Sequence, residues 1–172
     1  MKREICGISL LALLVAGCST DKTPIVFLSE AKIPPGLNGS SDAAKGLSKE
    51  DEQKIELLAF TYMLEHHPWN DSDYAAICMQ ADDSVVDAMI NKFPHRNPPI
   101  KHGDRLDLRS AKTPLDRDTG LPVLILGVDV QEPGADGTVA AAGRWYAGTD
   151  VKGVFNFTMK KTGEGWMIAG VK

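Results

Sequence analysis

The first half of the chain places its hydrophobic residues at the spacing of amphipathic helices. Over residues 48–67 apolar side chains recur every three or four positions, and Ser48 stands where it can cap the N-terminus of a helix. A second apolar stripe covers residues 83–93, with Asp83 or Ser84 as its cap. These spacings predict two helices, of which the first should pack on a sheet.

Later in the chain apolar and polar residues alternate, which is the period of a β-strand. Residues 121–130 are almost continuously apolar, which predicts a strand near the centre of a sheet. Residues 132–137 are rich in Gly, Pro and Asp and predict a hairpin turn. Residues 74–80 are apolar but too short to distinguish strand from helix. Further strands are expected over residues 106–109, 139–147, 155–160 and 166–171, the last three as an antiparallel meander.

One of these strands carries different chemistry on its two faces. Trp145 has one parity and Arg144 and Tyr146 have the other, so strand geometry puts them on opposite sides of the sheet. Asp129, Arg144 and Tyr146 are therefore our candidate ligand pocket, on the concave face of the sheet. A solvated sheet face explains the same three residues without any function.

The order of these elements suggests a known architecture. Two helices followed by a bent antiparallel sheet, ending in Gly163-Glu164-Gly165-Trp166-Met167-Ile168, resemble the cystatin-like roll of nuclear-transport-factor-like domains. The resemblance covers residues 47–172 in the order of elements, but only the final hairpin in residues. It implies a single α+β domain with its helices packed on the bent sheet. No catalytic residue of that superfamily has a counterpart in a matching motif here.

The start of the chain predicts where the protein is sent. Residues 8–16 are apolar but span about half of the roughly 20 residues that a membrane-crossing helix needs, so they indicate a targeting signal. Its end, Val15-Ala16-Gly17-Cys18, resembles the lipobox of bacterial lipoproteins. The resemblance implies that residues 1–17 are removed, that Cys18 receives acyl chains, and that Ser19 favours the periplasmic face of the outer membrane. The alternative is an ordinary secretory signal in which Cys18 is incidental.

Residues 18–46 separate this signal from the expected domain. They are rich in Ser, Gly, Pro, Asp and Lys, a composition typical of a flexible tether, which would span roughly 30 Å as a coil. Residues 25–28, Ile-Val-Phe-Leu, are apolar enough to dock on the domain or on a partner. Whether they dock or stay with the tether is an open alternative.

Charge and cysteine content narrow the function. The chain has 19 basic and 23 acidic residues and a formal net charge of −4, which argues against a nucleic-acid partner. With residues 1–17 removed and Cys18 lipidated, Cys78 is left without a cysteine to pair with. Its apolar neighbours predict an inert buried thiol, and a reactive or intermolecular thiol is the alternative.

Motifs of enzyme active sites are absent. The sequence has no G-x-S-x-G, H-E-x-x-H, G-x-G-x-x-G or C-x-x-C pattern. The four histidines stand at a helix end and in a loop, and the aspartates around the second helix lack the spacing of a calcium loop. We therefore expect no catalytic residue, no cofactor and no metal.

These observations favour a binding protein. Trp69 is the candidate for an exposed aromatic contact with a partner, and core packing is the alternative. The leading hypothesis is a non-enzymatic lipoprotein, anchored to the bilayer through Cys18, that binds another protein as an envelope-complex component or as an immunity protein. One alternative is a ligand-binding or hydrolytic roll with a pocket between helices and sheet. Another is a structural spacer of the envelope.

Overall fold

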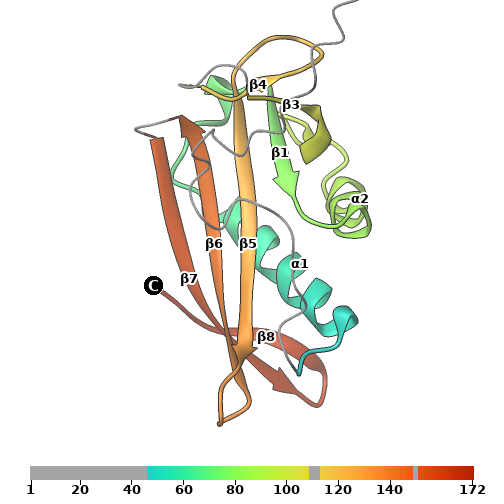
Figure 1. Cartoon of the computed structure of the whole chain (residues 1–172), viewed down its shortest axis with the longest axis vertical. Helices are drawn as coiled ribbons and strands as arrows, with labels where there is room; N and C mark the ends of the chain where they lie inside the picture. The colour runs from blue at the N-terminus through green and yellow to red at the C-terminus, as the bar shows by residue number, and fades with distance from the viewer. Residues whose placement is uncertain (1–45, 109–112, 149–150) are drawn as a thin grey trace, which may run out of the picture.

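The computed structural model describes residues 46–108, 113–148 and 151–172, and has a mixed α+β fold (Figure 1). Two α-helices, α1 (Lys49–Glu65) and α2 (Asp83–Lys92), accompany a six-stranded sheet. The order of this sheet is β2 (Ile100–His102), β1 (Ala76–Gln80), β5 (Val123–Pro133), β6 (Thr138–Gly148), β7 (Val151–Thr162) and β8 (Gly165–Val171). A separate two-stranded sheet pairs β3 (Leu106–Asp107) with β4 (Leu115–Asp116).

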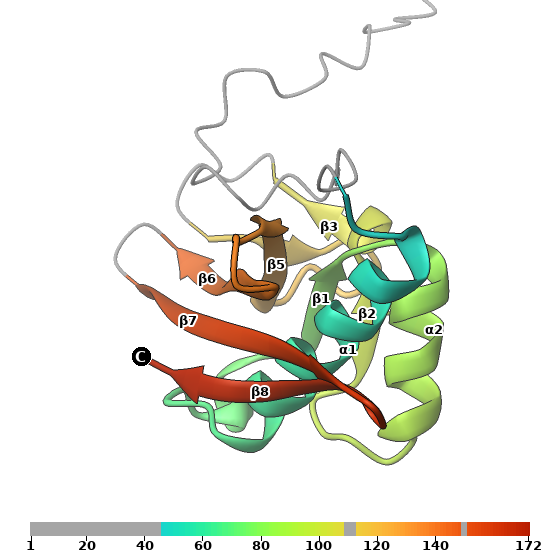
Figure 2. The same cartoon turned by 90° about the horizontal axis from the view of Figure 1, so that it is seen from below.

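Helix α1 forms where the sequence predicts it. The Ser48 hydroxyl accepts a hydrogen bond from the Asp51 backbone N–H at 3.1 Å, so Ser48 is the N-cap as expected. Seen end-on, the sheet curves around α1, which touches β5, β6, β7 and β8 (Figure 2). The expectation that the first helix packs on a sheet is therefore confirmed.

The second helix corrects two expectations. Strand β1 lies between α1 and α2 in the chain, so the helices do not both precede the sheet. The N-cap of α2 is Asp82 rather than Asp83 or Ser84, and its side chain makes no capping hydrogen bond. The Asp82 side chain instead forms an ion pair with Lys49 of α1, with 2.8 Å between the ammonium nitrogen and a carboxylate oxygen.

The sheet is mixed, so the expectation of a wholly antiparallel sheet is wrong. Strand β1 runs parallel to both β2 and β5, with Ile77 beside Ile100 and Leu124. Helix α2 is the crossover between β1 and β2, the usual connection between parallel strands. Residues 76–79 are buried, which explains their unbroken apolar sequence and settles residues 74–80 as containing a strand.

The rest of the sheet follows the expected meander. Strands β5, β6, β7 and β8 pair antiparallel in chain order, and β5 lies inside the sheet between β1 and β6. Of the strand expected over residues 106–109, Leu106 and Asp107 form β3, which pairs with β4 outside the main sheet, and residue 109 lies outside the described residues.

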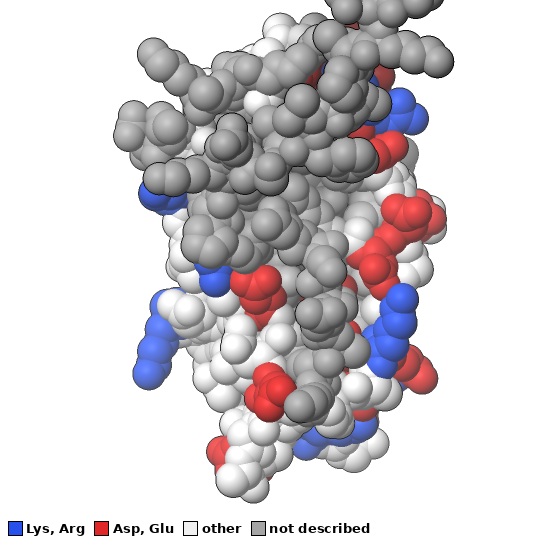
Figure 3. All heavy atoms as spheres, in the orientation of Figure 1, with Lys and Arg blue, Asp and Glu red and all other residues white. Residues whose placement is uncertain are grey.

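The two faces of the sheet pack against different parts of the chain. The larger core lies on the helix side and joins α1 and α2 to residues such as Leu124, Leu126 and Phe157. A smaller cluster on the opposite face contains Cys78, Ile125 and Leu106 of β3. On the surface seen in Figure 3, acidic and basic side chains are intermingled along the side where α2 lies, which is typical of a solvated surface.

The contact between α1 and β6 allows a first prediction. A Cβ atom added at Gly143 would come within 2.5 Å of Met63 Sδ and 2.7 Å of Phe157 Cε2, and both of these side chains are buried. Gly143→Ala should lower the free energy of unfolding by about 1–3 kcal/mol, as overpacking does. Denaturant unfolding measures this, with Gly163→Ala as the control because no atom lies within 4 Å of its added Cβ. Equal stability of the two variants would contradict the close packing.

Candidate functional site

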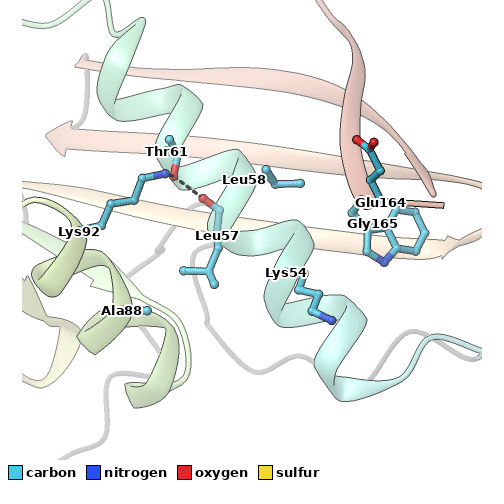
Figure 4. Close-up of a pocket in the computed structure, with 9 residues that line it drawn as sticks. Lys54, Leu57, Leu58, Thr61, Ala88, Lys92, Glu164 and Gly165 are labelled. Atoms are coloured by element: carbon cyan, nitrogen blue, oxygen red, sulfur yellow. Dashed lines mark hydrogen bonds between the residues drawn. The ribbon is translucent and has the colours of Figure 1, made fainter. Parts of the chain in front are cut away.

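A surface groove opens between α1, α2 and the β7–β8 turn (Figure 4). Its cavity volume of about 420 Å³ falls in the range of ligand and side-chain binding pockets. Three segments far apart in the sequence line it: Lys54, Leu57, Leu58 and Thr61 from α1, Ala88 and Lys92 from α2, and Glu164, Gly165 and Trp166 from the turn.

Helix α1 contributes leucines to the groove and has carboxylates on its inward side. Leu57 and Leu58 lie at the two borders of the buried face that contains Ala59 and Met63: both are half-buried, pack against the main core and also line the groove. Because these leucines line the groove, part of its floor is apolar. The parts of the two side chains that stay exposed in the groove are available for binding.

On the inward side, Glu52 and Glu56 are only 3% and 7% exposed and lie one helical turn apart. Burial, and after it the nearby carboxylates of Glu52 and Asp82, raise the pKa of the Glu56 carboxyl to about 7, while Lys49 acts in the opposite direction. A buried carboxyl of this kind favours its neutral form and costs stability when ionised.

The wall of the groove is fastened to the start of α1. The Trp166 indole N–H donates to Asp51 Oδ1 at 2.8 Å, and Lys161 Nζ donates to both oxygens of the same carboxylate at 3.1 and 2.9 Å. These hydrogen bonds, from Lys161 first and then Trp166, lower the pKa of Asp51 to about 2. The carboxylate therefore stays ionised near neutral pH and holds the turn against the helix.

The two lysines of the groove are held differently. Lys54 Nζ lies 2.7 Å from Glu50 Oε1, one helical turn away. Lys92 Nζ instead donates to the Thr61 hydroxyl at 2.9 Å, and that hydroxyl donates to the Leu57 carbonyl at 2.7 Å. Within the described residues, Lys92 has no carboxylate at ion-pair distance.

The candidate pocket of Asp129, Arg144 and Tyr146 does not contribute to this groove. Arg144 Nη2 lies 3.1 Å from Asp129 Oδ2, so the structure brings these two together. Tyr146 packs with Cys78 on the sheet face opposite the helices, and strand alternation puts Arg144 on that face as well. Arg144 and Tyr146 therefore cannot line a pocket between the helices and the sheet. As the sequence predicts, they lie on the opposite face of β6 from Trp145.

Trp69 is buried rather than exposed. Its side chain is 7% exposed, stacks on His67 with 4.5 Å between ring centroids, and lies 5.7 Å from Trp145. Its indole N–H donates to Asp71 Oδ1 at 3.1 Å, and Arg96 donates to both oxygens of the same carboxylate. Core packing, the alternative to a protein contact, therefore describes Trp69.

The remaining candidates divide into buried groups and groups outside the described residues. Cys78 is fully buried, and burial raises the pKa of its thiol to about 12, so the reactive thiolate does not form near neutral pH. Cys18, Ser19 and residues 25–28 lie outside the described residues. Neither described helix is long and apolar enough to cross a bilayer, and no group of three or more His, Cys, Asp or Glu in the described part is placed to hold a metal ion.

Comparisons with protein-family models, curated proteins and solved structures found no match for this chain. The sequence reasoning also missed the groove. The one pattern in the sequence that indicated the groove is that apolar residues occupy two sides of the 48–67 helix, at Ile55 and Phe60 and also at Leu57 and Leu58. A helix that is apolar on two sides has a second surface to cover.

Glu56 generates a prediction about pH. Its pKa rises from 4.5 when unfolded to about 7 when folded, so the folded state binds the proton more tightly and stability falls as pH rises between these values. Glu56→Gln should remove this loss, so that the variant gains about 3 kcal/mol relative to the natural protein between pH 4 and pH 8. Denaturant unfolding at both pH values measures the gain.

The matched control is Glu50→Gln, which changes an exposed glutamate on the same helix. Its difference from the natural protein should vary little over the same range. If Glu56→Gln changes the free energy of unfolding by the same amount at both pH values, the pKa of Glu56 is not raised in the folded protein.

Proposed function

We propose that this chain is a lipoprotein, anchored through Cys18 to the periplasmic face of the outer membrane, whose domain binds another protein without catalysing a reaction. The support for the anchor is the sequence of residues 1–19, with its short apolar stretch and lipobox-like end. One acyl chain holds a protein only marginally, whereas two or three hold it firmly. Residues 18–46 then act as the tether between bilayer and domain.

The proposal extends to the type of fold. Helix α1 in the curve of the β5–β8 meander is the arrangement expected of a cystatin-like roll. In this description β1, α2 and β2 form an additional parallel unit between α1 and the meander.

The observation that carries the binding proposal is the exposed apolar surface in the groove. Leu57, Leu58 and Trp166 are half-buried, and their exposed parts form the apolar portion of a groove that charged side chains rim. Apolar surface with a polar rim marks protein interaction sites. Tryptophan is enriched among the residues that dominate binding energy. An envelope-complex component and an immunity protein are both consistent with this patch.

A small-molecule ligand is the second candidate. It is favoured by the concavity of the groove, whose volume of about 420 Å³ lies within the range of small-ligand pockets. Heat stabilisation of the protein by small molecules, lost on substitution of the groove, would support this candidate over a protein partner.

The anchor is tested by Cys18→Ser. The variant should move from the membrane fraction to the soluble fraction and should no longer incorporate radiolabelled palmitate, because the acylated sulfur is gone. Cys78→Ala is the control and should keep both properties, since that thiol lies in the core. A natural protein without label, or a Cys18→Ser variant that stays in the membrane fraction, would argue for an ordinary signal.

The binding surface is tested by Leu58→Asp. Calorimetric titration with the products of adjacent genes should find a one-to-one complex, and a charge on the groove floor should weaken it at least tenfold. The control is Val154→Asp, because Val154 is 52% exposed and lies on β7 outside the groove. Since Leu58 also packs on the core, thermal midpoints are measured for both variants to show that they are folded. Equal weakening by both substitutions, or by neither, would place the partner elsewhere.

A further inference from the structure

The groove is electrically asymmetric. Lys92 of α2 lines one side, and Glu164 of the β7–β8 turn lines the opposite side, with the α1 leucines between them (Figure 4). Lys54 also lines the groove, but Glu50 neutralises it at 2.7 Å. Lys92, by contrast, has no carboxylate at ion-pair distance among the described residues, and its ammonium group lies 5.6 Å from the centroid of the Phe93 ring.

Lys92 has hydrogen-bond donors left for an anion. Its ammonium group donates one hydrogen bond to the Thr61 hydroxyl, and that hydroxyl donates its own proton to the Leu57 carbonyl. Two ammonium protons remain for another acceptor. A carboxylate is the suitable acceptor, because charge-assisted hydrogen bonds are about twice as strong as neutral ones.

The charge of Lys92 is opposite in sign to the net charge of the chain. The chain has a formal net charge of −4, so an acidic partner is repelled by most of the protein. A carboxylate that enters the groove meets attraction at Lys92 and repulsion at Glu164. These opposite signs fix the direction in which an acidic segment can lie.

We propose that the groove receives a short segment of the partner protein in which an aliphatic side chain stands beside an aspartate or glutamate. The aliphatic side chain packs on Leu57, Leu58 and Trp166, and the carboxylate binds Lys92. This inference rests on the proposed protein-binding function and names the chemistry of the partner's segment.

The experiment uses the mature lipidated protein in phospholipid nanodiscs, which keep detergent out of the groove. A displayed library of random seven-residue peptides is selected on the natural protein and on variants. The natural protein should enrich peptides that combine aliphatic residues with Asp or Glu. Lys92→Met should keep the aliphatic preference and lose the acidic one, and Lys92→Glu should turn it into a preference for Lys or Arg.

Affinity measurements with single enriched peptides then give the size of each effect. An enriched acidic peptide should bind Lys92→Met roughly tenfold more weakly, the loss of one charge-assisted contact. Added salt should weaken its binding to the natural protein more than its binding to Lys92→Met, because only the natural protein has the attraction to Lys92 to lose. Lys160→Met is the matched control, because Lys160 is an exposed lysine of β7 that does not line the groove. Equal thermal midpoints show that the variants are folded.

The outcomes separate the two proposals. Peptides whose binding is lost in Leu58→Asp but which have no acidic preference, or keep it in Lys92→Met, overturn the inference and leave protein binding at the groove intact. If no enriched peptide depends on Leu58, the groove is not a protein-binding site, and both this inference and the proposed binding surface fail.

Discussion

The packing of α1 into the curve of the sheet is the contact on which the other features of this domain depend. Phe60 and Met63 are fully buried, and Met63 lies so close to Gly143 of β6 that a Cβ atom there has no room. Because this face of the helix is fixed against the strands, the opposite side must face outward. Leu57 and Leu58 stand at the borders of the packed face, so they contact the core and also line the groove.

The same packing has an electrostatic cost. Fixing the rotation of α1 brings Glu52 and Glu56 to its inward side, where an ionised carboxylate is poorly solvated. Apolar side chains fill the other buried positions of this helix, so two buried glutamates are a local conflict of the kind that is expected where function constrains a sequence.

Much of the fold could be predicted, because helix spacing and strand alternation are local properties. The cap at Ser48, the central position of β5 and the opposed faces of β6 all follow from neighbouring residues. The parallel unit could not be derived in this way, because β2 has three residues and its pairing with β1 depends on contacts across the crossover of α2. The groove was hidden for a related reason: spacing shows that α1 has apolar residues on two sides, but only the packed sheet decides which side is covered.

Because its lining comes from α1, α2 and the final hairpin, the groove exists only in the folded domain. Asp51 connects α1 with the hairpin, since its backbone N–H donates to the helix cap while its carboxylate accepts hydrogen bonds from Trp166 and Lys161. Any molecule that binds the groove therefore binds the folded state alone, and its binding free energy adds to the stability of the fold. An occupied groove would offset part of the cost of ionising the buried Glu56, so recognition and folding are linked through the same helix.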